Sequence, residues 1–123
     1  MRPGIVSASC AVLLLAACSP VGEAHLLNGF GGNPAHGAVL IGRTQCGACH
    51  EIPGIQEAHG LVGPPLTHFA RRTIIAGVLA NTPDNLVHWL RDPQSVTPGN
   101  AMPATGLDDQ QARDVAAYLC TLQ

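Results

Sequence analysis

The chain has 123 residues, of which 46% are hydrophobic and 11% are charged, and its formal net charge is −2. This length suits one small domain, and the hydrophobic content argues against intrinsic disorder. The lack of a basic excess excludes a nucleic-acid-binding protein. Aromatic residues make up only 3% of the chain. A small domain with so few large side chains must complete its core by other means, and a buried cofactor would do so.

The first 17 residues have the pattern of a secretory signal peptide: Arg2 precedes an apolar stretch that ends in small residues. The tetrapeptide Leu15-Ala16-Ala17-Cys18 then resembles a bacterial lipobox, in which the cysteine thiol accepts the lipid. The alternative is an ordinary cleaved signal peptide followed by an incidental cysteine. The lipobox predicts a protein that is lipid-anchored at Cys18 on the periplasmic side of a membrane in a bacterial cell envelope.

Residues 18–33 are rich in glycine and show little pattern, so we expect a flexible, lipidated tether in front of a domain at 34–123. An alternative is that the apolar side chains of this segment pack on the domain surface; they are Leu26, Leu27 and Phe30.

The rest of the chain predicts an all-α domain with three main helices. Asn33-Pro34 is a good helix start, and this first helix extends to about residue 44. Thr82-Pro83 starts a second helix, which Asp92-Pro93 ends. A capping box at 108–111 starts the last helix, which extends to about residue 122. Residues 51–69 are expected to be irregular, 70–80 to hold one short helical turn, and no strand alternation is visible.

One motif carries the chemistry: Cys46-Gly47-Ala48-Cys49-His50 has the pattern C-x-x-C-H. Two thiols on one turn can form thioether bonds to a haem, and the adjacent His50 can then coordinate the iron. A thioredoxin-like dithiol would need a βαβ setting, and structural zinc would need a second pair of ligands. A disulfide between Cys46 and Cys49 would leave His50 without a role. The motif therefore favours one covalently bound haem c.

The second axial ligand is predicted to be Met102, the only methionine after the initiator. It lies between Pro98 and Pro103 in a loop, where a methionine is not needed to fill a helix face. A thioether ligand favours Fe(II) and raises the reduction potential. The rival ligands are the other histidines: His25, His36, His59, His68 and His88.

These motifs resemble those of the class I c-type cytochromes from about residue 34 to residue 122. The matching features are the haem motif, Gly63-Pro64-Pro65-Leu66, the Trp89 helix that ends at Pro93, and Ala101-Met102-Pro103. Residues 63–107 are similar in particular to the cytochrome c domain of bacterial haem–copper oxidase subunit II. The resemblance implies the cytochrome c fold around one haem.

The resemblance also implies roles for six further residues. The Pro64 carbonyl would accept a hydrogen bond from His50 and fix its tautomer, and Leu66 would line the haem face. Arg72 would pair with a haem propionate, and Asn100 would hydrogen-bond a propionate. Trp89 would lie against the methionine side of the haem. Gly37 would mark the point where the first helix crosses the last, near Val115 and Tyr118. Cys120 has no assigned partner or role.

We therefore expect a mono-haem, membrane-tethered one-electron carrier of a respiratory chain, without enzymatic activity or a small-molecule substrate of its own. Its partners would be redox proteins: a quinol-oxidising complex or dehydrogenase as donor, and a terminal haem–copper oxidase as acceptor. Because the chain is acidic, we expect brief apolar docking around the haem edge. One alternative is a permanently docked haem subunit of an oxidase or dehydrogenase. Another is a haem sensor or peroxidase-like protein, which would need an open iron site.

Overall fold

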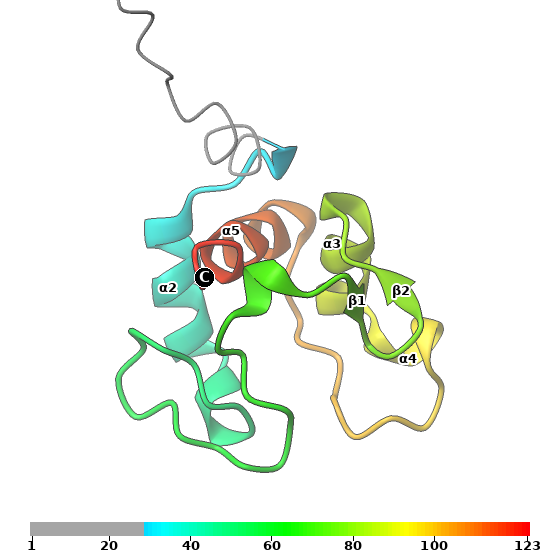
Figure 1. Ribbon diagram of the computed structural model, residues 1–123, viewed down its shortest axis with the longest axis horizontal. Helices are drawn as coiled ribbons and strands as arrows, with labels where there is room; N and C mark the ends of the chain where they lie inside the picture. Colours follow the sequence, from blue (N-terminus) through cyan, green and yellow to red (C-terminus); the bar gives the residue numbers. More distant parts are fainter. Residues whose placement is uncertain (1–28) are drawn as a thin grey trace, which may run out of the picture.

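Helix α2 (Pro34–Arg43) starts where the sequence predicts, because Asn33 caps it: its side chain accepts hydrogen bonds from the backbone N–H groups of Ala35 and His36. The computed structural model describes residues 29–123 (Figure 1). The predicted signal peptide, the lipid site at Cys18 and the tether up to residue 28 lie outside the described residues. Within 29–123, no helix is both long enough and apolar enough to cross a membrane.

The last helix, α5 (Asp109–Leu119), packs across α2 (Figure 1). Its start is the predicted capping box, in which the side chains of Asp108 and Gln111 bond each other's backbone N–H. At the contact, a Cβ added to Gly37 would lie 2.0 Å from the carbonyl oxygen of Asp114. The predicted crossing at Gly37 is therefore confirmed, since only glycine lets the two backbones approach this closely.

The middle of the chain holds more regular structure than the sequence predicts. Helix α3 (Pro83–Arg91) has its predicted Thr82 cap, but Asp92 then caps a further short helix, α4 (Pro93–Val96). The 3-10 turn η2 (Phe69–Arg71) and an antiparallel hairpin, β1 (Ile74–Ile75) with β2 (Leu79–Ala80), occupy the stretch where one helical turn was expected. Strands of two residues are too short to produce a visible alternation. The all-α prediction holds for the fold class.

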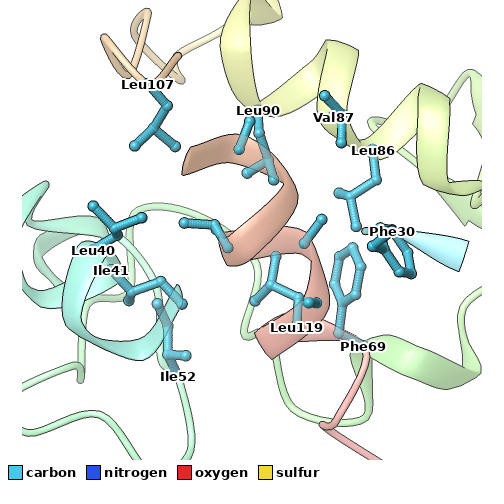
Figure 2. Close-up of a cluster of buried hydrophobic side chains, with 14 of the residues drawn as sticks. Phe30, Leu40, Ile41, Ile52, Phe69, Leu86, Val87, Leu90, Leu107 and Leu119 are labelled. Atoms are coloured by element: carbon cyan, nitrogen blue, oxygen red, sulfur yellow. The ribbon is translucent and has the colours of Figure 1, made fainter. Parts of the chain in front are cut away.

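The hydrophobic core surrounds α5, which lies between α2 and α3 (Figure 2). Apolar side chains from α2 and α3 cover the two sides of this helix. The buried residues labelled in the figure are Phe30, Leu40, Ile41, Ile52, Phe69, Leu86, Val87, Leu90, Leu107 and Leu119. Small alanines on α5, which are Ala112, Ala116 and Ala117, allow its neighbours to approach closely.

Phe30 corrects the expected tether boundary. Its side chain is only 3% exposed and belongs to the core cluster, so the alternative in which apolar side chains of this segment pack on the domain holds for Phe30. The backbone N–H of Asn33 is likewise fixed, by a 2.7 Å hydrogen bond to the carboxylate of Asp114. The tether boundary at residue 33 is thus too late for Phe30, because burying its ring stabilises the packed arrangement.

A buried carboxylate joins this N-terminal segment to α5. Asp114 accepts hydrogen bonds from Asn33 N–H, from Gln110 and from His36, whose Nδ1 lies 2.6 Å from the carboxylate. Burial alone would raise the pKa of Asp114, but these hydrogen bonds and the charge of His36 lower it below its usual value. Gln110 also donates to the Gly31 carbonyl. The network therefore fastens the start of the folded domain to its last helix.

Candidate functional site

The C-x-x-C-H motif folds into one tight turn directly after α2. The 3-10 turn η1 (Cys46–Ala48) brings the backbone N–H groups of Cys49 and His50 onto the carbonyl of Cys46, at 3.2 and 3.0 Å. Both cysteines are free thiols, and the hydroxyl of Thr44 lies 3.3 Å from the Cys46 sulfur. The turn therefore presents two thiols and an imidazole from five consecutive residues, as thioether attachment to a haem requires.

The irregular segment after the motif wraps back along it. Gly60 N–H donates to the carbonyl of Gly47, and Gly63 N–H donates to that of Cys49. Both glycines are needed for space, because a Cβ at Gly60 would lie 2.5 Å from the backbone of Ala48, and one at Gly63 would meet the His50 ring. We name 44–68 and 97–107 together the ligand loops, since they hold the motif and Met102.

His50 has one ring nitrogen committed and one free. Its Nδ1 lies 2.7 Å from the Pro64 carbonyl oxygen, which is the hydrogen bond that the resemblance implies. Because a carbonyl only accepts, Nδ1 must carry the proton, and the lone pair is left on Nε2. A Cβ at Gly63 would lie 2.3 Å from Cε1 of the ring, so the loop backbone rests against the imidazole. The ring is thus fixed in the tautomer that a metal ligand needs.

Arg72 supports the same loop. Its guanidinium lies over the Phe69 ring, 5.3 Å from the centroid, and also donates to the carbonyl of Pro65. This places a permanent positive charge directly beside the proline pair that holds His50. An arginine has five N–H donors, so these contacts leave donors free for a carboxylate ligand.

Asn100 differs from its expected role as a propionate partner. Its Nδ2 donates to the carbonyls of Pro93, at 3.0 Å, and Thr97, at 2.6 Å. Its Oδ1 accepts the backbone N–H of Met102 at 2.8 Å. Both amide hydrogens are therefore used within the loop, and none is left for a propionate. In this structure Asn100 positions the backbone of Met102 instead.

Four of the predicted haem contacts are half-buried and pack against the edge of the core: Cys46, Leu66, Trp89 and Met102. They come from four separate segments of the chain. Half-covered apolar side chains that all adjoin one core are what a flat apolar group would cover. Together with the free Nε2 of His50 and the thioether of Met102, this donor set fits a covalently attached haem.

Thr97 in the ligand loops carries a buried hydroxyl that would fit a bound group with a hydrogen-bond acceptor. Its hydroxyl oxygen is the one buried side-chain polar atom within 29–123 that has no hydrogen bond. A buried hydroxyl without a partner is destabilising, and nearly all such groups in folded proteins are satisfied. Thr97 belongs to the same ligand loop as Met102, and an acceptor on a group bound there, such as a haem carboxylate, would satisfy its hydroxyl. The sequence did not mark Thr97, because a threonine in a polar loop carries no distinctive signal.

The rival histidines are placed away from the motif or engaged elsewhere. His36 bonds Asp114, His88 bonds the Ser95 hydroxyl at 2.9 Å, and His68 bonds the backbone oxygen of Gln123. His59 is exposed, and His25 lies outside the described residues. Within 29–123, no group of three or more His, Cys, Asp or Glu side chains is arranged to hold a metal ion.

Cys120, which has no predicted role, is half-buried and follows the end of α5. Burial raises the pKa of its thiol to about 11, so it stays protonated at neutral pH and is a poor nucleophile.

Comparisons with known proteins agree with this geometry. The sequence model of the family described as Cytochrome c matches residues 34–123. Cytochrome c oxidase subunit 2 from Alkalihalophilus pseudofirmus is 38% identical over 88 residues, covering 71% of this chain and 25% of the relative. The same subunit from Bacillus subtilis is 34% identical over 87 residues, covering 68% and 24%. The chain thus spans about a quarter of the length of these relatives.

Cytochrome c2 from Rhodopila globiformis is 34% identical over 103 residues, and the match covers 75% of this chain and 95% of the relative. The helical fold, the motif at Cys46–His50 and the family match agree with one another. The chain therefore belongs to the cytochrome c family and is a class I c-type cytochrome, an electron-transfer haem protein.

Proposed function

We propose that this chain binds one haem c through Cys46 and Cys49, with His50 and Met102 as axial ligands, and works as a membrane-tethered one-electron carrier. The observation that carries the proposal is the fixed tautomer of His50, whose Nδ1–H is bound by Pro64 while Nε2 is free. When bound, the haem iron supplies the reversible one-electron couple between Fe(III) and Fe(II). The chain needs no substrate pocket for this reaction.

The residues of the ligand loops hold the ligands in place in both oxidation states. Pro64 orients the imidazole, and Asn100 fixes the backbone N–H of Met102. Leu66 of the ligand loops and Trp89 of α3 supply half-buried apolar side chains that a bound haem would cover. A rigid, dry site reduces the rearrangement that accompanies each electron transfer, because the surrounding dipoles already have their final orientation.

Absorption spectra of purified wild-type protein and of Met102→Ala test the ligand assignment. Wild-type protein should show the charge-transfer band of methionine bound to Fe(III), and Met102→Ala should lose it and have a lower reduction potential. His59→Ala, which removes an exposed rival ligand, is the control and should change neither. Rapid carbon monoxide binding to reduced wild-type protein would instead favour the sensor or peroxidase-like alternative.

The docking surface is proposed to include Leu61 and Val62, which are 89% and 75% exposed. They directly precede Gly63, whose backbone rests against the His50 ring. Two adjacent exposed apolar side chains next to the proposed haem site suit a brief apolar contact with a redox partner. The exposed acidic residue Glu51 bonds the same loop through its backbone, so a partner with an apolar face and a basic rim fits best.

Electron transfer to a purified terminal oxidase tests this surface. The double variant Leu61→Ser/Val62→Ser should raise KM for the oxidase about tenfold while the absorption spectrum stays unchanged. Val39→Ser removes a similarly exposed apolar side chain from α2 and should have no effect. Equal effects of both variants would contradict the assignment of this docking surface.

The proposed acceptor is a terminal haem–copper oxidase. The similarity to part of cytochrome c oxidase subunit 2 supports this choice, because a domain of that kind belongs to an oxidase in those relatives. The similarity to nearly the whole of a cytochrome c2 supports a separate carrier over a permanently docked subunit. Purification in mild detergent separates the two: a carrier is recovered alone, whereas a docked subunit remains with its complex through a large apolar interface.

The membrane anchor is proposed at Cys18, with the domain on the periplasmic side. The lipobox-like sequence before Cys18 supports it. Cys18→Ala should move the haem protein from the membrane fraction to the soluble fraction after cell breakage, because the lipid chains supply the membrane affinity. Cys120→Ala is the matched cysteine control and should leave the protein in the membrane fraction.

A further inference from the structure

Two side-chain amides hold the backbone around Met102, where backbone–backbone hydrogen bonds are nearly absent. Between residues 98 and 107 the backbone makes one such bond, from Asn100 N–H to the Thr97 carbonyl. The conformation of this segment must therefore be fixed by side chains. Asn100 supplies part of this support through its contact with the Met102 N–H.

Gln94, from α4, supplies the rest. Its Nε2 donates to the carbonyl of Asn100 at 3.0 Å and to that of Met102 at 2.9 Å. Its Oε1 accepts the backbone N–H of Gly99 at 3.0 Å. Both polar atoms of this one side chain are thus bound to backbone groups of three loop residues: Gly99, Asn100 and Met102.

The two amides together bind both polar groups of the Met102 backbone. Asn100 accepts from its N–H, and Gln94 donates to its C=O. Asn100 is itself anchored to the carbonyls of Pro93 and Thr97 at the two ends of α4. The Met102 backbone is therefore connected to α4 by a closed set of hydrogen bonds, which defines where the sulfur can lie.

We propose that Gln94 is a positioning residue for the Met102 sulfur, and that with Asn100 it forms an amide clamp that keeps this ligand on the iron. The proposal rests on the proposed function, in which Met102 is an axial ligand. Gln94 is exposed, so its loss leaves the released backbone groups open to water and does not create buried unsatisfied groups. Loss of the clamp should therefore increase the mobility of the loop at 97–107 and have a smaller effect on the unfolding free energy of the whole domain.

The test uses haem-loaded Gln94→Ala with three readouts. The amide of Gly99 should exchange with solvent about tenfold faster, the factor expected for one lost hydrogen bond. Free imidazole should bind the ferric iron about tenfold more tightly, because it competes with a less restrained sulfur. The methionine–iron charge-transfer band should also disappear at lower pH than in wild-type protein.

Gln94→Glu sharpens the test. It keeps the acceptor for Gly99 N–H, but its other oxygen faces the carbonyls of Asn100 and Met102 and cannot donate to them when ionised. This variant should leave the exchange of Gly99 near wild type and still weaken the sulfur–iron bond. Protonating the new carboxyl at low pH restores one donor, so the affinity for the neutral fraction of the imidazole should move back toward that of wild-type protein at the same pH.

Two control variants show whether the effects are specific to Gln94. Gln56→Ala removes another exposed glutamine, and Ser95→Ala perturbs α4 beside Gln94; neither should change any readout. Unchanged exchange, imidazole affinity and band in Gln94→Ala, with the band lost in Met102→Ala, would overturn the clamp alone. An effect of Ser95→Ala equal to that of Gln94→Ala would overturn it as well. A wild-type protein without the band would overturn both the clamp and the assignment of Met102.

Discussion

The α2–α5 crossing and the ligand loops are built on different principles. At the crossing, two backbones touch at Gly37, and neighbouring side chains such as Ile41 and Val115 are each 1% exposed. In the ligand loops, the apolar side chains of Leu66 and Met102 stay half-buried. The crossing is held by close packing within the protein, whereas the loops are held mainly by hydrogen bonds, and their apolar side chains remain partly exposed. The α2–α5 crossing is therefore fully packed by protein side chains alone, whereas the ligand loops need the cofactor to cover their apolar side chains.

Preventing haem attachment should produce the largest loss of unfolding free energy. Cys46→Ser/Cys49→Ser should carry no covalent haem by intact mass and should lose at least about 5 kcal/mol of unfolding free energy, comparable to the whole stability of a small domain. The remaining amide protection should be greatest in α2 and α5, because their contact does not involve the haem. Ligand-loop amides as protected as in wild-type protein would contradict the comparison.

The next largest effect is expected at the crossing itself. Gly37→Ala places a methyl group 2.0 Å from the Asp114 carbonyl oxygen and should lower the free energy of unfolding by at least about 3 kcal/mol, since backbone cannot move aside without separating the helices. Gly42→Ala is the matched control on the same helix, with no heavy atom within 4 Å of the added Cβ. It should stabilise by about 0.5–1 kcal/mol through helix propensity. Urea denaturation measures both, and similar values for the two variants would refute the packing argument.

A smaller and pH-dependent effect is expected at Asp114. Asp114→Asn should lower the unfolding free energy at pH 7 by about 2 kcal/mol, because three donors then face a neutral amide. The pKa of Asp114 is lowered in the folded state, so protonation favours unfolding. The contribution is complete above about pH 4 and is lost as the pH falls below it. The difference between wild type and variant should therefore shrink in denaturation curves between pH 5 and about pH 2.

The control for that experiment is Glu57→Gln, which removes the same charge from an exposed loop position. It should produce a difference of less than about 0.5 kcal/mol at either pH. A wild-type advantage over Asp114→Asn that stays constant down to pH 2 would rule out this account of the carboxylate.

The smallest effect is expected in the ligand loops at Thr97. Thr97→Val keeps the shape of the side chain and removes the hydroxyl. In the haem-loaded protein it should lower stability by about 1 kcal/mol if a haem carboxylate accepts a hydrogen bond from this hydroxyl, which has no partner within the described residues. Thr73→Val changes an exposed threonine and should have no measurable effect. A gain in stability for Thr97→Val would mean that the hydroxyl lacks a partner in the loaded protein as well.

The sequence predicted the parts of this structure that local chemistry determines. Asn33, Thr82 and Asp108 each cap a helix within their own next turn, so the helix starts follow from neighbouring residues alone. The site motif was equally local, because Cys46, Cys49 and His50 form a single turn. Gly37 also gave a usable signal, since a glycine inside a helix is unfavourable unless another backbone lies against it.

What the sequence could not predict depends on contacts between distant segments. Phe30 looked like part of a tether because its burial requires partners from other segments of the chain, such as Phe69 and Leu86, that only folding brings near. Asn100 was predicted to bind a haem propionate, because the neighbouring residues in the sequence do not show that its side-chain amide donates to the carbonyls of Pro93 and Thr97. Gln94 was not marked at all, since a glutamine in a polar segment gives no sign of three simultaneous backbone contacts.

The contact between the start and the end of the domain has a consequence for the order of assembly. His36 and Asp114 are 78 positions apart, and the haem motif lies between them. A chain that ends before Asp114 cannot form this contact, so the N-terminal segment joins α5 only when nearly the whole domain has been synthesised. The two thiols of the haem motif are therefore present in the growing chain well before this contact can form.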